Sequence, residues 1–518
     1  MSDLLTLELD QLTASAMARR AAAKWRLVFV ALIGLSALVG YSVMSPIPMP
    51  SAIGWLVYLI AIAAIFYEPR YGVYLLIFFC LTGDNLVIPW YPFNKNFSSG
   101  ESLLFLNSSM IVSPLEVTLV LTAVAWLVRG LMQRKLDFYT GSLFKPMMIF
   151  IGFVVFGLVY GIGRKGNVNI ALWEARAIFY LALYFVLVSN LLRKREHVIT
   201  VMWAVVLALF LEGIAGTLKV TVELGGNLKG IEAIGEHSMS IHEGTLIVLI
   251  AIGFLYKLPR KQVLLMLAML PPVFYAYVSN QRRASYISVG LALALMAFPL
   301  FRENRKAFWR IVPTLAVIGV IYTAAFWNSS SGIAAPARAI RSVIAPVKDG
   351  RDDRSNVYRD IENINTGYTI RKTPLTGVGF GQKFYIIAPL PDISFFAWWE
   401  YITHNSVIWF WMKTGGGGFF MMTFLVSFAL MRGARVVWRA PSGWMAAAGL
   451  LASLYIVMHF VYAYVDMSWE GQSLMYVGLM MGLINSLERI IAEPVKVPPK
   501  RWPWQPEPLP VLGLAPIE

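Results

Sequence analysis

Long apolar runs separated by short polar stretches occupy most of the chain. About fourteen of these runs reach or approach the roughly 17–25 residues that an α-helix needs to cross a bilayer. They fall at about residues 27–44, 52–67, 72–90, 113–128, 146–163, 178–192, 198–216, 241–256, 262–280, 284–301, 311–327, 405–431, 442–464 and 473–488. The pattern predicts an all-α, polytopic integral membrane protein with about 14 transmembrane helices.

The polar stretches differ in charge, and every second one is basic. The basic stretches contain Arg129, Arg134 and Lys135; Arg193, Lys194 and Arg195; Lys257, Arg260 and Lys261; Arg302, Arg305, Lys306 and Arg310; and Arg432, Arg435 and Arg439. Cytoplasmic loops of membrane proteins are enriched in Lys and Arg. The alternation therefore predicts that both termini face the cytoplasm, with the first run as an uncleaved anchor.

On the opposite side, residues 328–404 form a much longer stretch. Loops of this length are rarely structureless in compact proteins, so we expect a mainly helical extracytoplasmic subdomain, including a helix at 354–370 that ends before Pro374. The predicted parts, in order, are a cytoplasmic tail (1–26), N-terminal transmembrane helices (27–140), a transmembrane core with arginine segments (141–327), the long loop (328–404), C-terminal transmembrane helices (405–488) and a proline-rich cytoplasmic tail (489–518).

The composition supports this class of protein. Of the 518 residues, 58% are hydrophobic and only 14% are charged, whereas soluble proteins carry about 25% charged residues. The net charge of +15 is explained by basic loops that face anionic lipid, and we expect no nucleic-acid partner. The single cysteine, Cys80, excludes a disulfide within the chain, and its place in an apolar run predicts a buried side chain.

Several arginines lie on the predicted outer side of the membrane, where basic residues are unexpected because Lys and Arg are enriched in cytoplasmic loops. Arg176 follows a short outer loop, Arg282 and Arg283 occupy a tight turn, and Arg338 opens the long loop. Arginine binds phosphate oxygens through two parallel hydrogen bonds. Salt bridges to nearby acids are the alternative explanation; those acids are Glu174, Asp352, Asp353, Asp360 and Glu362. As a set, the arginines suggest that the ligand is a lipid-linked diphosphate.

One of the five histidines, His404, is a candidate general base. Glu400 precedes it by four residues, so on a helix the two would share a face, and a carboxylate raises the basicity of an imidazole. His237 and His242 lack a third ligand at a suitable spacing, so we expect no metal site. We interpret His197 as a solvated residue and His459 as a packed residue.

The histidine is followed by Lys413 and by four glycines, Gly415 to Gly418. The glycines either break a helix or allow two backbones to approach closely. A lysine within a membrane-spanning helix requires an anionic partner unless it reaches the interface. The sequence does not identify that partner.

Four stretches together resemble the bacterial O-antigen ligase and O-antigen polymerase superfamily. His404 and Asn405 are followed, after nine residues, by Gly415 and Gly418, and TPLTGVGFGQKFY resembles the element that precedes this histidine. That element contains Pro374 and Gly377. SNQRRASYIS and WEARAIFYLALYF resemble the family's two arginine segments, although the second has four residues between arginine and leucine where ligases usually have three. The resemblance covers about residues 171–487.

The resemblance implies a GT-C-like membrane enzyme that is a metal-independent inverting glycosyltransferase and needs no cofactor. It would act on the periplasmic face of the bacterial inner membrane and take glycan from an undecaprenyl-diphosphate-linked donor. Carried over by position, the resemblance makes His404 the catalytic base and Arg176 and Arg282 the diphosphate ligands. To these we add Glu400, from its spacing to His404, as a catalytic residue, and Arg283 and Arg338, from their place on the outer side, as diphosphate ligands.

The acceptor is left open by the sequence. A polysaccharide polymerase would use a lipid-linked glycan, whereas an O-antigen ligase would use lipid A-core, and related enzymes use protein. The length of the chain and the departure near Arg176 favour the polymerase. An alternative of another class is a transporter or flippase of lipid-linked glycans, which predicts ionisable residues inside the helices and often two related halves.

Overall fold

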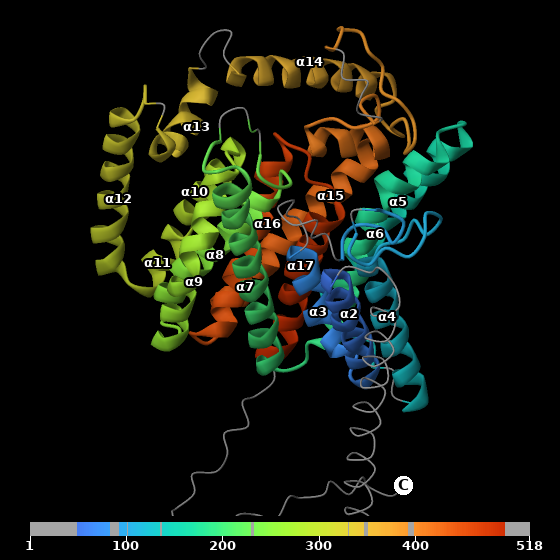
Figure 1. Ribbon diagram of the computed structural model, residues 1–518, viewed down its shortest axis with the longest axis horizontal. Helices are drawn as coiled ribbons and strands as arrows, with labels where there is room; N and C mark the ends of the chain where they lie inside the picture. The colour runs from blue at the N-terminus through green and yellow to red at the C-terminus, as the bar shows by residue number, and fades with distance from the viewer. Residues whose placement is uncertain are drawn as a thin grey trace, which may run out of the picture.

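The computed structural model describes residues 49–82, 93–100, 102–134, 137–228, 231, 233–329, 331–345, 351–391 and 398–492. Within these ranges the regular elements are all helices, packed side by side in one bundle (Figure 1). The predicted first run at 27–44, the N-terminal tail and residues 493–518 lie outside the described residues. The all-α fold is thus as predicted.

In the described part of the chain, ten helices are long and apolar enough to cross a membrane, counting the α10–α11 pair as one. They are α4 (Pro114–Met132), α5 (Phe144–Gly163), α6 (Val168–Leu191), α7 (Arg195–Leu218, continued by a π-helical turn), α9 (Arg260–Ser279), α10 with α11 (Arg283–Leu295 and Ala297–Glu303), α12 (Arg305–Ala325), α15 (Ser406–Arg439), α16 (Trp444–Ala463) and α17 (Gly471–Ala492). Three further apolar helices in this part are α2 (Met49–Tyr67), α3 (Arg70–Leu81) and α8 (Met239–Leu255). The chain is therefore a multi-pass membrane protein by the length and composition of its helices.

The centre of the bundle is the contact between α6 and α17. A Cβ atom placed on Gly478 would lie 2.5 Å from the carbonyl oxygen of Leu181, and one on Gly482 would lie 2.6 Å from Val188. These glycines let the two helix backbones approach closely, as small residues do in membrane proteins. In contrast, α12 stands apart at the edge (Figure 1) and contains no buried residue, which fits a helix surrounded by lipid.

Two further helices, α13 (Ala335–Ile344) and α14 (Arg351–Lys372), lie outside the bundle, and α14 runs across one end of it (Figure 1). We call this end the α14 face. The predicted helix at 354–370 is confirmed, and it ends two residues before Pro374, whose ring disfavours a helical conformation in the residue preceding it. The basic stretches are at the opposite end, where Arg129 pairs with Glu68 at 2.9 Å.

Helix α15 is interrupted once, at Gly415, which has φ 70° and ψ −176°. The segment 374–384 lies against this break: the amide of Gly416 donates to the carbonyl of Pro374 at 2.8 Å, and that of Val378 donates to Met412 at 2.8 Å. A Cβ on Gly415 would lie 2.0 Å from the carbonyl oxygen of Leu375. The glycines thus both break the helix and permit a backbone contact.

Two other motif glycines also lie where a side chain would collide, but only Gly377 takes part in this contact. Gly377 has φ +68°, and a Cβ there would lie 2.5 Å from the carbonyl oxygen of Met412. A Cβ on Gly418 would lie 2.2 Å from the hydroxyl oxygen of Thr414. Glycine is therefore required at 377 by conformation and space, and at 418 by space alone.

Lys413, two residues before the break, is fully buried in an ion pair. Its Nζ lies 2.8 Å from Oε1 of Glu174 on α6, which is also fully buried, and donates to the carbonyl of Gln382 at 2.7 Å. Oε2 of Glu174 accepts from the amide of Gly381 at 2.6 Å. The pair therefore joins α15, α6 and the segment 374–384, and Glu174 is the anionic partner that the sequence left unidentified.

We expect Gly415→Ala to lower the free energy of unfolding by more than about 2 kcal/mol, because alanine is strained at positive φ and its Cβ would collide with Leu375. Gly290→Ala is the matched control: a Cβ there meets nothing within 4 Å, so the change should stay within about 0.5 kcal/mol. Unfolding of the purified protein in detergent measures both. Equal stability of the two variants would contradict the backbone contact.

Lys413→Met should lower the free energy of unfolding by about 3–5 kcal/mol, because it leaves the buried charge of Glu174 without its partner. Adding Glu174→Gln to this variant removes the unpaired charge, so the double variant should be more stable than Lys413→Met alone. A double-mutant cycle in detergent measures this coupling. Strictly additive losses would show that the two side chains do not form an ion pair.

Candidate functional site

His404 lies on the α14 face, directly before α15. Its Nδ1 is 2.8 Å from Oε2 of Glu362, and its backbone amide donates to the same oxygen at 3.1 Å. The Glu362 side chain is buried, whereas that of His404 is 27% exposed. Among the described residues, Nε2 of His404 makes no hydrogen bond. The contact therefore places the proton of the neutral imidazole on Nδ1 and leaves Nε2 as an accessible base.

Helix α14 holds Glu362 in place through the side chains next to it. Asn365 accepts hydrogen bonds from the amides of Ile387 and Ala388, at 2.9 and 2.8 Å, and Thr369 accepts one from the amide of Tyr385 at 2.9 Å. These bonds give side-chain partners to backbone amides of an irregular segment that has no regular secondary structure to pair them. They fix α14 against the segment that leads to His404.

The aromatic ring of Tyr358 stands edge-on to His404, with centroids 5.5 Å apart and an interplanar angle of 81°. Burial and the neighbouring Glu362 carboxylate both raise the pKa of the Tyr358 hydroxyl above its ordinary value. The phenol therefore stays protonated at neutral pH, and it serves as a wall that restricts the orientation of the imidazole.

The expectation that Glu400 and His404 share a helical face is wrong. Helix α15 begins only at Ser406, and Glu400 lies in a turn where its carboxylate contacts Nζ of Lys383. Its backbone carbonyl accepts from the amide of Phe384 at 3.0 Å. The four-residue spacing therefore does not produce a contact, and the carboxylate of Glu362 occupies the position expected for Glu400.

Asn405 caps the N-terminus of α15. Its Oδ1 accepts from the amide of Ile408 at 3.1 Å, which satisfies one of the free amides of the first helical turn. The cap ends the irregular segment at a defined residue, so that His404 projects from the start of the helix. The neighbouring Ser406 donates to the backbone carbonyl of Asp466 at 3.2 Å. This bond ties the start of α15 to the loop between α16 and α17.

The side chain of Arg282, in the turn between α9 and α10, is directed toward that same loop. Its Nη1 lies 3.9 Å from Oδ2 of Asp466, while Oδ1 of Asp466 lies 3.1 Å from Nδ1 of His237. Burial by itself would raise the pKa of Asp466, but the hydrogen bond and charge of His237 and the charge of Arg282 outweigh it and lower the pKa. Asp466 is therefore an ionised carboxylate held between a histidine and an arginine.

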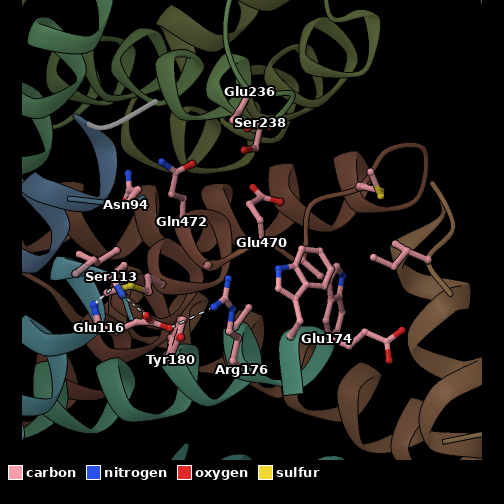
Figure 2. Close-up of a pocket in the computed structure, with 18 of the residues that line it drawn as sticks. Asn94, Ser113, Glu116, Glu174, Arg176, Tyr180, Glu236, Ser238, Glu470 and Gln472 are labelled. Carbon is pink, nitrogen blue, oxygen red and sulfur yellow. Dashed lines mark hydrogen bonds and ion pairs between the residues drawn. The ribbon is translucent and has the colours of Figure 1, made fainter. Parts of the chain in front are cut away.

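Arg176 lies on α6 and faces a cavity of about 520 Å³. Its Nη1 is 3.6 Å from Oε1 of Glu116. Glu116 is itself fixed by a capping box at the start of α4, because its other oxygen accepts from the amide of Ser113 at 2.5 Å. Figure 2 shows the Arg176 guanidinium below Glu470, whose carboxylate is directed toward Ser238, while the Glu174 carboxylate is turned away from both.

Aromatic rings and polar groups share the wall of this cavity. Trp173 stacks on Trp398 with centroids 4.3 Å apart, and Trp409 and Trp469 contact each other at 5.8 Å. The polar lining includes Asn94, Asn96, Glu236, His237, Ser406 and Gln472. A cavity of this size and mixed lining suits a ligand with both apolar and hydrogen-bonding surfaces. His404 does not line it, but Ile402 and Ser406, which flank His404, do.

Of the four predicted diphosphate ligands, only Arg176 lines the cavity; Arg282, Arg283 and Arg338 do not. Arg283 is the first residue of α10. Arg338 donates hydrogen bonds to the backbone carbonyls of Ser329 and Ser331, so its guanidinium holds the chain that leads into α13. Among the residues described by the structure, no group of three or more His, Cys, Asp or Glu side chains could hold a metal ion.

Two carboxylates of this site could not be located from local sequence. Glu362 lies 42 residues before His404 in the chain, and Asp466 lies 229 residues after His237. Periodicity and short spacings report only on neighbours along one helix. The sequence offers only a weak signal for these two acids: both fall in polar stretches on the predicted outer side of the membrane, where His404 also lies.

Neither a protein-family model nor a curated protein sequence matches the chain.

Proposed function

We propose that the protein is a metal-independent inverting glycosyltransferase. It transfers or polymerises surface-polysaccharide units from an undecaprenyl-diphosphate-linked donor on the periplasmic face of the inner membrane. The observation that carries this proposal is the His404–Glu362 pair: a partly exposed imidazole at a helix start, held at Nδ1 by a buried carboxylate and available at Nε2. The resemblance of the surrounding motifs supports the assignment to glycan transfer.

In this mechanism His404 is the general base. Nε2 removes the proton of an acceptor hydroxyl while the oxygen attacks the anomeric carbon of the donor sugar. Glu362 stabilises the imidazolium that forms, because its carboxylate lies 2.8 Å from Nδ1. Proton removal of this kind contributes about 10²–10⁴-fold to a rate. Attack on the face opposite to the leaving group inverts the configuration.

The leaving diphosphate requires positive charge, which we assign to Arg282 and Arg176. Arg282 is oriented by the buried carboxylate of Asp466, and Arg176 faces the cavity with its side chain 40% exposed. Fixed guanidinium groups stabilise a developing phosphate charge without the reorganisation that water would need. This arrangement supports donor binding between the start of α15 and the cavity.

The position of the site supports a periplasmic reaction. His404, Arg282 and Asp466 all lie on the α14 face, whereas the basic stretches expected in the cytoplasm lie at the opposite end of the bundle. With this orientation both termini are cytoplasmic. The donor would then be reached from the outer leaflet.

A transporter or flippase of lipid-linked glycans is the second candidate, and one observation favours it. Glu243 on α8 is fully buried, and neither of its carboxylate oxygens has a hydrogen-bond partner among the described residues. His459 on α16 is buried in the same way. Ionisable groups inside membrane helices often mark transport paths. The sequence has no internal repeat of the kind that transporter halves show.

His404→Gln should reduce glycan transfer by at least about 10²-fold, because glutamine cannot accept the proton. Glu362→Gln should also reduce it, since the imidazolium loses its counter-charge. Glu400→Gln is the matched comparison and should retain activity, because Glu400 contacts Lys383 instead. The measurement is transfer by the purified protein in liposomes. Loss of activity in Glu400→Gln with an active Glu362→Gln would reverse our assignment.

Reconstitution with lipid-linked repeat units alone separates the candidate activities. A polymerase, which we favour, lengthens the glycan without another acceptor, whereas a ligase transfers only when lipid A-core or protein is added. A flippase moves the intact lipid-linked unit across the bilayer and forms no new glycosidic bond. Gel analysis of products and an accessibility assay for the donor distinguish the three. Translocation without product would refute the transferase.

A further inference from the structure

The site contains a second histidine–carboxylate pair, His237–Asp466. Nδ1 of His237 lies 3.1 Å from Oδ1 of the buried Asp466, and the His237 side chain is 35% exposed. Unlike His404, His237 lines the cavity that Arg176 enters. We infer that His237 is a second acid–base residue of the reaction, which gives a proton to the leaving diphosphate. The inference rests on the proposed glycosyl transfer.

The backbone around His237 is fixed by the turn that carries Arg282. Asn280 accepts from the amide of Ile234 at 3.0 Å and donates to the carbonyl of Glu236 at 3.2 Å. The hydroxyl of Tyr462 donates to the carbonyl of His237 at 2.6 Å. His237 and Arg282 therefore reach Asp466 from two segments that are themselves bonded together. Such cross-bonding holds an acid–base group within the narrow range that proton transfer needs.

The two histidine pairs lie around the same end of α15. Ser406, two residues after His404, donates to the backbone carbonyl of Asp466 at 3.2 Å and also lines the cavity. On α14, Glu362 binds His404, while Arg359, one turn earlier, contributes positive charge that lowers the pKa of Asp466. Both histidine–carboxylate pairs are thus joined to the start of α15, and a reaction with a separate base and acid requires two such groups.

The charges that face His237 come from several elements. Asp466 lies in the α16–α17 loop, Glu236 precedes His237, and Glu470 bonds to the neighbouring Ser238. The cavity lining also contains Lys95, Glu116, Glu174 and Arg176, and Arg282 and Arg359 contribute positive charge at Asp466. Burial raises the pKa of Glu470. Figure 2 shows Glu236 and Ser238, which flank His237, on the side of the cavity facing Glu470.

The proposed step conserves protons and electron pairs. The acceptor O–H bond breaks and its proton goes to Nε2 of His404, while the acceptor oxygen forms a bond to the anomeric carbon. The bond between that carbon and the diphosphate oxygen breaks, and its electron pair stays on the oxygen. Nε2–H of protonated His237 then gives its proton to this oxygen. At the end of the step His404 is protonated and His237 is neutral. Proton exchange with solvent restores the starting forms after the products leave.

A hydrogen-bonded histidine that only holds Asp466 in place is the alternative. It would explain the Nδ1 contact, but it requires neither the exposure of the ring nor its position on the cavity wall. The two roles predict different pH profiles. An acid that must be protonated makes activity fall as the pH rises, whereas a packing residue leaves the profile unchanged.

The test uses the full-length protein in liposomes with an undecaprenyl-diphosphate-linked glycan as donor. His237→Gln should lower kcat by about 10²-fold, should change KM for the donor much less, and should remove the fall in rate at alkaline pH. In His237→Ala, added imidazole should restore part of the activity, because the truncated side chain leaves space in the cavity. His197→Gln, a histidine change at the opposite end of the bundle, should match the wild type.

Three results would overturn the inference. They are a wild-type rate in His237→Gln, an alkaline fall that persists in that variant, and a folded His237→Ala that imidazole does not rescue. Any of these, found alongside an active wild type and an inactive His404→Gln, removes His237 from the chemistry and leaves the proposed transferase intact. A wild-type protein that makes no glycan product refutes the proposed function itself, so the two failures are distinguishable.

Discussion

The buried ion pair between Lys413 and Glu174 is the constraint on which the rest of the site depends. Two charges without access to water are stable only when their geometry and remaining hydrogen bonds are satisfied, and here a backbone amide and a carbonyl complete both groups. The pair therefore fixes the position of α15 relative to α6. His404 precedes Lys413 by nine residues, and Arg176 follows Glu174 by two. The Lys413–Glu174 ion pair thus fixes the positions of both His404 and Arg176.

The glycines make this arrangement possible. Gly415 and Gly377 remove the side chains that would separate the segment 374–384 from the break in α15. That segment leaves α14 and turns back toward the bundle, so it also determines how α14 lies over the start of α15. The contact between Glu362 and His404 is a consequence of this docking. The motif glycines and the histidine are therefore parts of one structural unit, although they do not touch.

The sequence predicted what depends on neighbouring residues and missed what depends on distant ones. Apolar runs predicted the helices because a membrane span is a local property, although the run at 284–301 is divided between α10 and α11. The partner of His404 was placed at Glu400 on the assumption of a continuous helix. The chain instead turns before Ser406, and the carboxylate arrives from α14. Asp466 was missed for the same reason: the loop meets His237 only after the bundle has packed.

The N-terminal helices, whose role the family resemblance leaves open, take part in the cavity. The capping box of α4 holds Glu116 beside Arg176, and that ion pair is 3.6 Å long and partly exposed. Ion pairs of this kind contribute at most about 1 kcal/mol, so an incoming diphosphate could displace the carboxylate. Until then, Glu116 keeps the guanidinium directed into the cavity. Helix α4 therefore prepares the arginine for an anionic ligand as well as closing one wall of the cavity.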